Sequence, residues 1–420
     1  MTELRDCVVA VDIGGTTLKG AAFDRRGRVL AARTRPTFGV CERAADSLSA
    51  LVRELLDLMR EQDRCPAAIG IASPGMVDTR RGIVISAVNL GWSGLPLRAR
   101  LRDEFGLPVA LEHDARAAAL GEQAAQPGSL RDFAFIPIGT GIAAAIVTGG
   151  QLMAGATGSA GEFGHIPVVP GGRRCACGQL GCIEAYASGP AIEARYRELG
   201  GGQRSTADIA GRAVRATTAA AIPAIPATTV PPATTGGPGG ADRDAPDEGA
   251  RRVWAEAIDA LAAGLLGLVA LTDPAAVIIG GGVAEAGAAL LDPLTVALAA
   301  RLTWRSHPRL LLSVLGPRAG LIGAGLCGWA LAPAPSAPAE TGTAAPGTAE
   351  PGTGEPGTAE PGTGEPGTGE PGTAAPGAAS PAWTAANGSV AAGPDPGPAG
   401  GFASTALAEL SSTATGEDRP

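Results

Sequence analysis

The chain has 420 residues, including 63 glycines and 35 prolines, and its formal net charge is −8. This charge argues against a basic nucleic-acid-binding surface, and seven cysteines in a chain of this length do not indicate a disulfide scaffold. The acidity is concentrated in residues 332–420, where ten acidic side chains accompany one base, Arg419, so residues 1–331 are close to neutral.

The first part of the chain alternates predicted strands with predicted helices, an order typical of α/β proteins. Helical spacing of leucines predicts a helix near residues 43–62, and an alanine-rich segment predicts another at 115–125. The pattern of strand, glycine turn and strand at residues 7–23 recurs at 133–147, which indicates two similar halves. Apolar runs predict strands at Cys7–Val11, Leu18–Phe23, Val29–Thr34, Ala67–Ala72, Val109–Leu111, Phe133–Ile138 and Ala143–Val147.

The first glycine turn, Asp12-Ile-Gly-Gly-Thr-Thr-Leu-Lys19, lies between two predicted strands. Gly14, Gly15 and Thr16 could hold a phosphate, because glycines let backbone amides approach an anion and a hydroxyl can donate to its oxygens. Asp12, at the strand end, could position Mg²⁺. A plain β-hairpin turn is the alternative. Lys19 is the single lysine of the chain.

Two further glycine turns follow predicted strands. The second, Gly139-Thr140-Gly141, formally matches the dinucleotide fingerprint, but a strand follows it where that fingerprint requires a helix. The third, Gly280–Gly282, leads from a buried strand into a helix, whose N-terminus offers free N–H groups and a favourable dipole. Three such turns on separate strands indicate phosphate binding more specifically than any one of them.

Two segments, residues 216–250 and 332–420, are predicted to be disordered. Both are rich in proline, glycine, threonine and alanine, and residues 346–370 repeat Pro-Gly-Thr-(Ala/Gly)-Glu. They have too few large apolar side chains to offset the entropy cost of ordering. The tail is a spacer or docking segment in one interpretation and solvated low complexity in the simpler one. About 300 residues remain, enough for two domains of ordinary size.

No export or membrane-spanning segment is expected. Residues 1–6 hold two acidic side chains and no apolar stretch, unlike a signal peptide. The longest apolar run, Ala260–Leu271, has 12 residues, which is a core-helix length, whereas crossing a bilayer requires roughly 18–20. We therefore expect a cytoplasmic protein with no membrane partner and no nucleic-acid partner.

From the N-terminus to about Gly325, the motifs resemble, in order, those of the ROK family of sugar kinases and sugar-responsive repressors, within the actin/hexokinase-like ATPases. Family repressors carry an N-terminal helix-turn-helix before the first glycine motif, and only eleven residues precede Asp12 here. The kinase branch is therefore expected. The matching stretches are Asp12–Lys19, Ser73–Gly75, Asn89–Trp92, Glu112–Ala119, Gly139–Gly141, Gly161–His165, Cys175–Glu184 and Ile279–Val283.

The resemblance implies an α/β fold of two actin-like (ribonuclease H-like) lobes with a cleft between them. The large lobe would form the contact surface of a homodimer or homotetramer. The implied parts are a small lobe at 1–125 completed by 321–330, a large lobe at 126–320 with a zinc loop at 165–184 and an insertion at 216–250, and a tail at 332–420.

The implied activity is ATP- and Mg²⁺-dependent phosphorylation of the 6-hydroxyl of a hexose, glucokinase-like, with a small-molecule sugar and ATP as partners. By resemblance, Asp114 is the catalytic base that faces this hydroxyl, whereas its place before a predicted helix would by itself suggest an N-cap. An N-acetylglucosamine or N-acetylmannosamine kinase is the alternative among enzymes. A sugar-binding regulator of the same family with weak or no kinase activity is the alternative from another class.

The resemblance also assigns residues to the two sides of the cleft. For Glu162 and Glu184, which the resemblance places at the sugar, the alternative interpretation is that both are ordinary carboxylates on the protein surface. The nucleotide, its phosphates and Mg²⁺ would be held by Asp12, Gly14, Gly15, Thr16, Lys19, Gly139, Thr140, Gly141, Gly281 and Gly282. The sugar would be contacted by Gly75, Asn89, His113, Asp114, Glu162, His165 and Glu184.

A metal-binding pattern, His-x9-Cys-x-Cys-x4-Cys, is formed by His165, Cys175, Cys177 and Cys182. Thiolates and a neutral imidazole suit tetrahedral Zn²⁺, and four protein ligands make a closed structural site. The alternatives are a disulfide bridge and free thiols. Cys175 and Cys177 are too close in sequence for an ordinary disulfide with each other, so a bridge among the three cysteines would leave one thiol unpaired. A structural zinc would fix the loop that bears His165 and Glu184.

Two residues depart from the family pattern, because many family sugar kinases have Asn where this chain has His113 and Arg116. His113 is expected to titrate near about pH 6–7, and Arg116 is expected to favour the ionised form of Asp114. The pair resembles a subset of the family that includes amino-sugar kinases. Glucose and N-acetylglucosamine therefore both remain open as substrates.

Overall fold

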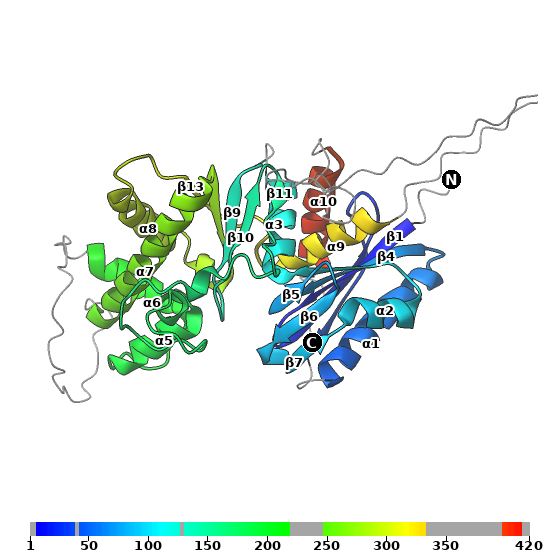
Figure 1. Ribbon diagram of the computed structural model, residues 1–420, viewed down its shortest axis with the longest axis horizontal. Helices are drawn as coiled ribbons and strands as arrows, with labels where there is room; N and C mark the ends of the chain where they lie inside the picture. Colours follow the sequence, from blue (N-terminus) through cyan, green and yellow to red (C-terminus); the bar gives the residue numbers. More distant parts are fainter. Residues whose placement is uncertain (1–5, 38–41, 127–129, 219–246, 333–396, 414–420) are drawn as a thin grey trace, which may run out of the picture. The chain divides into compact units, whose positions relative to one another are not determined.

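The computed structural model of the chain describes residues 6–37, 42–126, 130–218, 247–332 and 397–413. Two five-stranded mixed sheets and the helices packed on them make up most of these residues (Figure 1). The α/β class that the alternation of strands and helices predicted is confirmed.

The first sheet has the strand order β3-β2-β1-β4-β8. β1, β2 and β3 are antiparallel neighbours, whereas β4 lies parallel to β1 and β8 parallel to β4. The carboxyl ends of the parallel strands therefore meet at one edge, where Asp12 pairs with Ala72 and Ser73 pairs with His113. The strands are β1 (Asp6–Ile13), β2 (Thr17–Phe23), β3 (Val29–Pro36), β4 (Cys65–Ser73) and β8 (Val109–His113).

The second sheet repeats this arrangement in the order β11-β10-β9-β12-β13. β9, β10 and β11 are antiparallel neighbours, β12 runs parallel to β9, and β13 runs parallel to β12. The shared strand order and pairing confirm the two similar halves that the recurring strand–turn–strand pattern predicted. The strands are β9 (Phe133–Pro137), β10 (Ala145–Thr148), β11 (Gln151–Leu152), β12 (Ala276–Gly280) and β13 (Arg309–Leu312).

Two helices that are far apart in the sequence, α3 (Asp114–Ala125) and α9 (Ala319–Leu331), pack against each other at the first sheet. α9 contacts β1, β4 and β8, and α3 contacts strands of both sheets. α3 thus links the first sheet to the second, and α9 packs on both α3 and the first sheet. The other helices of the two sheets are α1 (Glu42–Glu61), α2 (Leu97–Phe105), α4 (Glu184–Ala187), α5 (Gly189–Glu198), α6 (Thr206–Thr218), α7 (Glu248–Thr272) and α8 (Ala288–Arg301).

A small antiparallel sheet of β5 (Met76–Asp78), β6 (Ile83–Ala87) and β7 (Trp92–Leu95) follows β4. The sequence predicts no strand in this segment, because such short strands give no clear alternation of apolar and polar residues. Val84 and Trp92 are buried and join the core of the first sheet. The segment carries two predicted sugar-contacting residues, Gly75 and Asn89.

The apolar run Ala260–Leu271 lies within α7, which has 25 residues. The helix is therefore longer than the 12-residue apolar run indicated. By length and composition, α7 is long and apolar enough to cross a membrane, and it is the one such helix in the described part of the chain. However, 61% of its most apolar window is buried inside the protein. Leu261, Leu265 and Val269 pack into the core of the second sheet, as in the core helix of a globular domain.

The prediction of two disordered segments differs in part from what the structure shows. Residues 219–246 and 333–396 lie outside the described residues. The ends of the first segment are helical, because residue 218 ends α6 and residue 248 begins α7. The prediction for the tail is wrong at Gly397–Thr413, which form helix α10. The average composition of the tail conceals the apolar face of this helix.

Candidate active site and metal site

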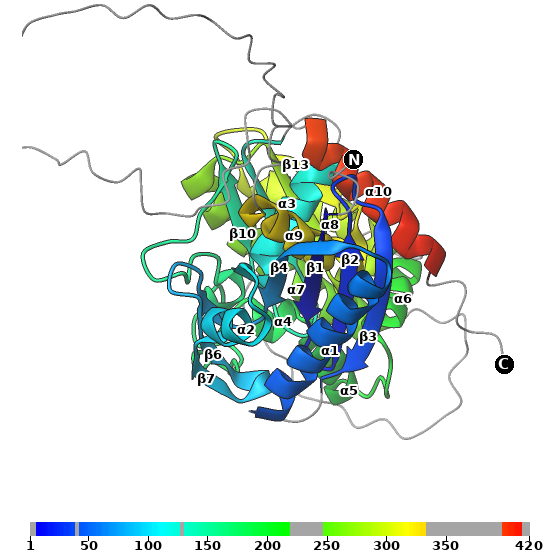
Figure 2. The same ribbon diagram turned by 90° about the vertical axis from the view of Figure 1, so that its right-hand side faces the viewer.

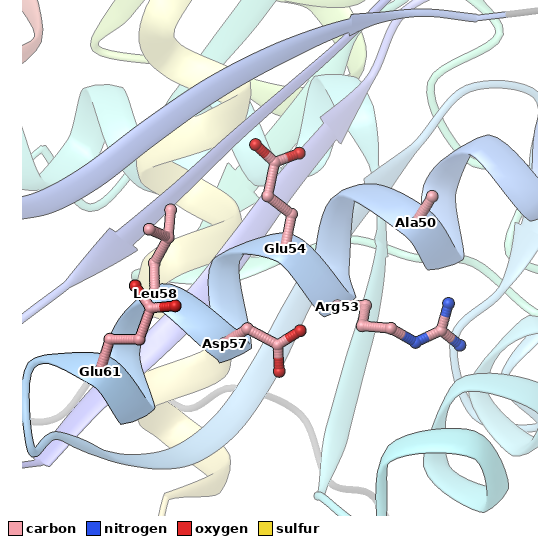
Figure 3. Close-up of a pocket in the computed structure, with 6 residues that line it drawn as sticks. All are labelled: Ala50, Arg53, Glu54, Asp57, Leu58 and Glu61. Atoms are coloured by element: carbon pink, nitrogen blue, oxygen red, sulfur yellow. The ribbon is translucent and has the colours of Figure 1, made fainter.

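A hollow on α1 is lined by side chains of that helix alone and has a volume of about 430 Å³ (Figure 3). Glu54 in this hollow is held by Arg33 at 3.0 Å and by Arg35 at 2.7 Å, and these bonds lower its pKa. Its carboxylate is therefore already paired, and no predicted site residue lines the hollow. The lining residues are Ala50, Arg53, Glu54, Asp57, Leu58 and Glu61.

A second cavity, of about 370 Å³, lies where residues from the ends of both sheets meet α3 and α9. The carboxylates of Asp12 and Asp114 line it together with the glycine turn Gly280–Gly282. A pair of acids beside a glycine turn offers both a base and backbone amides to a phosphorylated substrate, so we take this cavity as the candidate active site. Its other lining residues are Ala115, Ala118, Phe135, Pro137, Ala284, Glu285, Leu312, Ser313, Gly316, Pro317, Ala319 and Gly320.

Asp12 ends up in this cavity because it lies near the carboxyl end of β1, opposite Lys19 of β2. α9 passes so close that a Cβ on Gly320 would lie 2.9 Å from the Asp12 carboxyl carbon. Burial and the negative charge of Asp114 raise the pKa of Asp12 to about 7, and Lys19 acts in the opposite direction. A divalent cation would relieve this repulsion, and carboxylate oxygens suit Mg²⁺, so Asp12 fits the predicted role.

Asp114 is the first residue of α3, and its Oδ1 accepts a hydrogen bond from the N–H of Ala115 at 2.6 Å. An N-cap would instead accept from an N–H two or three residues further on, so the N-cap interpretation is wrong. Burial raises the pKa of Asp114 to about 6, although the Ala115 N–H and the Arg116 charge both lower it. The side chain stays 41% accessible, so a substrate can reach the carboxylate.

The two residues that depart from the family pattern flank Asp114. The Nδ1 atom of His113 lies 3.3 Å from Asp114 Oδ1. Burial, followed by the charge of Arg116, lowers the pKa of His113 to about 4, so the expectation that it titrates near neutral pH is wrong and the ring is neutral at pH 7. Arg116 lowers the pKa of Asp114 as expected, but burial outweighs it.

Arg116 is almost completely buried, with 1% of its surface exposed. Its Nε donates to Glu112 Oε1 at 2.6 Å, and its Nη1 donates to the carbonyl of Gly158 at 2.9 Å. Glu112 also accepts from the N–H of His113 at 2.7 Å. Arg116 therefore connects the first turn of α3 to the loop that leads to Glu162.

Replacing Arg116 by Met is expected to lower the free energy of unfolding by about 3–5 kcal/mol, because Glu112 would be left as a nearly buried charge without its cation. The double variant R116M/E112Q removes both charges and should recover much of this loss. Urea denaturation of the wild type, both single variants and the double variant measures the coupling. Strictly additive effects of the two substitutions would contradict it.

The glycines of the first turn, Gly14 and Gly15, and Thr16 connect β1 to β2 and, unlike Asp12, do not line the cavity. Gly14 N–H donates to the Thr17 carbonyl at 2.9 Å, and the Thr37 hydroxyl donates to the Gly14 carbonyl at 2.8 Å. Among the described residues, apart from its own chain neighbours, no atom lies within 4 Å of the Cβ position at Gly15, so the described structure leaves this side of the turn open. Lys19 Nζ donates to the Pro317 carbonyl at 3.1 Å, which ties β2 to the rim of the cavity.

The second and third glycine turns lie side by side, because Ile138 N–H donates to the Gly280 carbonyl at 2.8 Å and Val283 N–H donates to the Ile138 carbonyl at 3.0 Å. Gly281 has φ +79°, and a Cβ there would lie 2.4 Å from the Ile138 carbonyl oxygen, so the close approach requires glycine. The next strand of the second sheet, β10, follows the second turn, which excludes the dinucleotide fingerprint. Gly281 and Gly282 line the cavity, whereas Gly139, Thr140 and Gly141 are not among its lining residues.

Glu122 is a buried carboxylate for which the sequence motifs predicted no role. It lies on α3 and accepts hydrogen bonds from the Ser313 hydroxyl, from Val314 N–H at 3.1 Å and from Leu315 N–H at 3.0 Å. Ser313 lines the cavity and begins the loop whose residues Gly316 and Pro317 also line it, so Glu122 positions this loop. Its presence as an acidic residue in a predicted alanine-rich helix was the feature of the sequence that could have indicated a buried, hydrogen-bonded carboxylate.

Replacing Glu122 by Gln is expected to lower the free energy of unfolding by about 1–3 kcal/mol, because the amide cannot accept from all three donors and its NH₂ would face an N–H. Since the loop lines the cavity, the KM for nucleotide should rise more than the KM for sugar. Glu61→Gln, at the exposed end of α1, serves as the matched control. Parallel increases in both KM values would contradict a role in positioning this loop.

The predicted sugar-contacting residues fall into two groups. Glu162 Oε2 lies 3.9 Å from His165 Nε2, and the charge of Glu162 acts on His113, so these three residues share one region. Gly75 and Asn89 lie on the segment after β4, where Asn89 is exposed on a short turn. They reach the same edge of the first sheet through Ser73, the neighbour of His113 in the ladder.

Glu184 joins this region to the second glycine turn. It begins α4, and its Oε2 accepts from Ile142 N–H at 2.9 Å. A Cβ on Gly141 would lie 2.9 Å from the same oxygen. Its other carboxylate oxygen lies 3.8 Å from Cys175 Sγ. The carboxylate is therefore placed between the glycine turn and the cysteine loop and is not a free surface group.

The four predicted metal ligands come together, and their ligand atoms all lie within 4.8 Å of one another. Cys177 Sγ is 3.7 Å from Cys182 Sγ, and Cys175 Sγ is 3.7 Å from His165 Nδ1. Tetrahedral zinc with bonds of about 2.3 Å requires ligands about 3.8 Å apart, so the residues fit this ion. No disulfide joins the cysteines of the described residues, which argues against the disulfide alternative.

His165 has two distinct nitrogens, and each faces a different part of the site. Nδ1 faces the cysteines, whereas Nε2 faces Glu162. One ring could thus serve the metal site and the sugar side at once, as the predicted double role of His165 requires.

Several known proteins are similar to this chain. A glucokinase of Streptomyces coelicolor is 34% identical over 327 residues, which cover 75% of this chain and 95% of that protein. The crystal structure of a ROK family glucokinase from Streptomyces griseus, in complex with glucose and AMPPNP, is similar with a TM-score of 0.60 and 31% identity, covering 77% of this chain and 99% of that one. An N-acetylmannosamine kinase of Salmonella newport is 36% identical over 193 residues, which cover 45% of this chain and 64% of that protein.

The family model described as ROK family matches residues 8–328, which include both sheets, the paired carboxylates and the cysteine loop. This match covers most of the chain and ends before α10. The chain therefore belongs to the ROK family.

Proposed function

We propose that the protein is an ATP-dependent glucokinase that transfers the terminal phosphoryl group of ATP to the 6-hydroxyl of glucose. The observation that carries this proposal is the convergence of Asp12 and Asp114 on one cavity that also contains the turn Gly280–Gly282. The similarity to glucokinases over nearly their whole length supports the kinase activity and the hexose substrate.

Asp114 acts as the general base that accepts the proton of the sugar hydroxyl. With a pKa of about 6, its carboxylate is mostly ionised at neutral pH and still basic enough to accept a proton. The bond from Ala115 N–H holds Oδ1, which leaves Oδ2 to face the substrate. The neutral His113 beside it can donate a hydrogen bond without adding a second charge.

The glycine turns supply the nucleotide side of the cavity. Gly281 and Gly282 would lie against the adenosine, and Gly14, Gly15, Thr16, Gly139, Thr140 and Gly141 would surround the phosphates. Asp12 would hold Mg²⁺, which when bound neutralises phosphate charge. Lys19 keeps the first turn next to the loop at Pro317.

The sugar side would be formed by Glu162, His165 and Glu184, with His113, Asn89 and Gly75 nearby. Several polar groups aimed at different hydroxyls provide specificity, because a buried polar group without its partner is costly. The zinc that His165 and the three cysteines would hold is structural, since four protein ligands leave no open position. It would fix both His165 and Glu184.

Two lobes would close over the bound substrates, a small lobe of residues 1–125 with 321–330 and a large lobe of residues 126–320. Closure excludes water and so limits wasteful ATP hydrolysis. We further propose a cytoplasmic protein, in line with free thiols at the six cysteines of the described residues. A homodimer or homotetramer is proposed, which light scattering would measure.

A coupled ADP assay with glucose, N-acetylglucosamine, N-acetylmannosamine, mannose and fructose tests the function. We expect the highest kcat/KM with glucose. ADP release that depends on none of the sugars would reject the kinase assignment and favour a sugar-binding regulator.

A kinase of N-acetylmannosamine or N-acetylglucosamine is the second candidate. Two observations favour it, namely the His113 and Arg116 pair and the similarity to the Salmonella enzyme. A preference for an N-acetylated sugar in the same assay would select this candidate over glucokinase.

A further inference from the structure

The C-terminal helix α10 lies beyond the part of the chain that matches the ROK family, and yet it packs against α3, α9 and β3 (Figure 2). One face of the helix is buried and the other is exposed. The buried residues are Phe402, Ala403, Ala406 and Leu410, and the exposed ones are Gly401, Ser404, Ala408 and Ser411. This spacing is that of one amphipathic helix face.

The surface under α10 is shaped to receive it. The Phe402 ring lies 5.3 Å from the ring of Phe23, centroid to centroid. Gly27 has φ +84°, and a Cβ there would lie 2.1 Å from the Phe402 carbonyl oxygen, so only glycine permits this approach. Arg28 and Glu409 form an ion pair at 4.0 Å at the edge of the contact. The contact therefore combines a packed apolar centre with a charged rim.

α10 would be a weak helix without this surface. Its sequence, GPAGGFASTALAELSST, contains three glycines and five Ser or Thr residues in 17 positions. Such residues disfavour helix, and the segment, at 17 residues, is only slightly longer than the roughly 12–15 residues below which even alanine-rich isolated helices are marginal in water. The helical form of this segment thus depends on docking.

The docked helix lies behind the candidate active site. It shares a hydrophobic cluster with Ala117, Ala118 and Ala119 of α3 and with Leu321 and Ile322 of α9. α3 begins at Asp114, and α9 brings Gly320 against the Asp12 carboxylate. α10 therefore rests on the two helices that position the two carboxylates.

We propose that residues 397–413 are an intramolecular ligand of the kinase fold, which docks on α3, α9 and β3 and braces the two helices behind the catalytic carboxylates. About 65 residues of the same chain separate α9 from α10, so docking is an intramolecular event and favours binding even of a weak helix. The extension of this chain thus has a binding partner within the same molecule.

Two matched substitutions test the docking in the full-length protein. Ala406→Arg places a charged side chain in the buried face, and Ala408→Arg places the same side chain on the exposed face, two positions away. Residues 332–418 contain no Lys or Arg, so each substitution also introduces a unique trypsin site into this segment. Mass spectrometry then reports cleavage after each new arginine, with each rate divided by that of the matching free peptide.

We expect A408R to be cleaved at least about tenfold more slowly than its free peptide, and A406R at nearly the rate of its free peptide. Hydrogen exchange of the α3 and α9 amides should be faster in A406R than in A408R. Equal relative cleavage rates, or unchanged exchange in α3 and α9, would overturn the proposal. A dimer in A408R that becomes a monomer in A406R would assign the docking to a second copy and overturn it also. None of these measurements requires sugar turnover, so their failure is distinct from failure of the proposed function.

Discussion

Replacing Asp114 by Asn is expected to lower kcat by about 10²–10⁴-fold, the range that a positioned general base contributes. The amide oxygen can still accept the hydrogen bond from Ala115 N–H, so the local geometry is retained, but the side chain cannot accept the proton of the sugar hydroxyl. Sugar affinity, measured by calorimetry, should therefore change little. Asp103→Asn, at an exposed position on α2, is the control.

The same group sets the expected pH dependence. The base must be ionised, and burial raises its pKa to about 6, so kcat/KM of the wild type should fall below about pH 6 and stay level above it. Asp12, with a pKa of about 7, titrates in the same range. Measuring the pH profile of kcat/KM at several Mg²⁺ concentrations separates the two groups, because bound cation would shift the part of the profile that reflects the titration of Asp12. Retained turnover in D114N would contradict the role of Asp114 as base.

Removal of zinc is expected to raise the KM for sugar by about 10–100-fold, the range seen when groups that support a site are lost. The physical reason is that the loop of residues 165–184 carries both His165 and Glu184. Within this loop the Sγ atoms of Cys177 and Cys182 lie 3.7 Å apart, which is not a covalent bond. Without the ion, those thiols do not hold the loop together. Chelation followed by re-addition of zinc should reverse the change.

Cys177→Ala provides the sharpest version of this test, because Cys177 is exposed and its truncation costs little packing. Cys65→Ala is the matched control, since Cys65 is also exposed but lies at the start of β4, outside the ligand set. We expect metal analysis to find about one zinc per chain in C65A and less in C177A. A zinc-free protein with an unchanged sugar KM would contradict the coupling between metal and sugar side.

The local patterns of the sequence predicted much of the fold. Apolar runs and glycine turns mark β1, β2 and β9, because strand and turn preferences act over a few residues. The spacing of His165 and the three cysteines likewise predicted a cluster that the structure brings together. The short strands β5, β6 and β7 were missed, because pairing with one another, more than their own composition, stabilises them.

The sequence alone therefore identifies the residue types of the site, their order along the chain and the family. The tertiary structure decides their state. His113 is neutral because burial and the charge of Arg116 disfavour its protonated form. The pKa of Asp114 is higher than that of an ordinary aspartate because the effect of burial outweighs that of the neighbouring Arg116 charge. α10 is a helix because a surface distant in sequence covers its apolar face. Desolvation and long-range packing depend on atoms that are adjacent only in the folded chain, and no local pattern contains them.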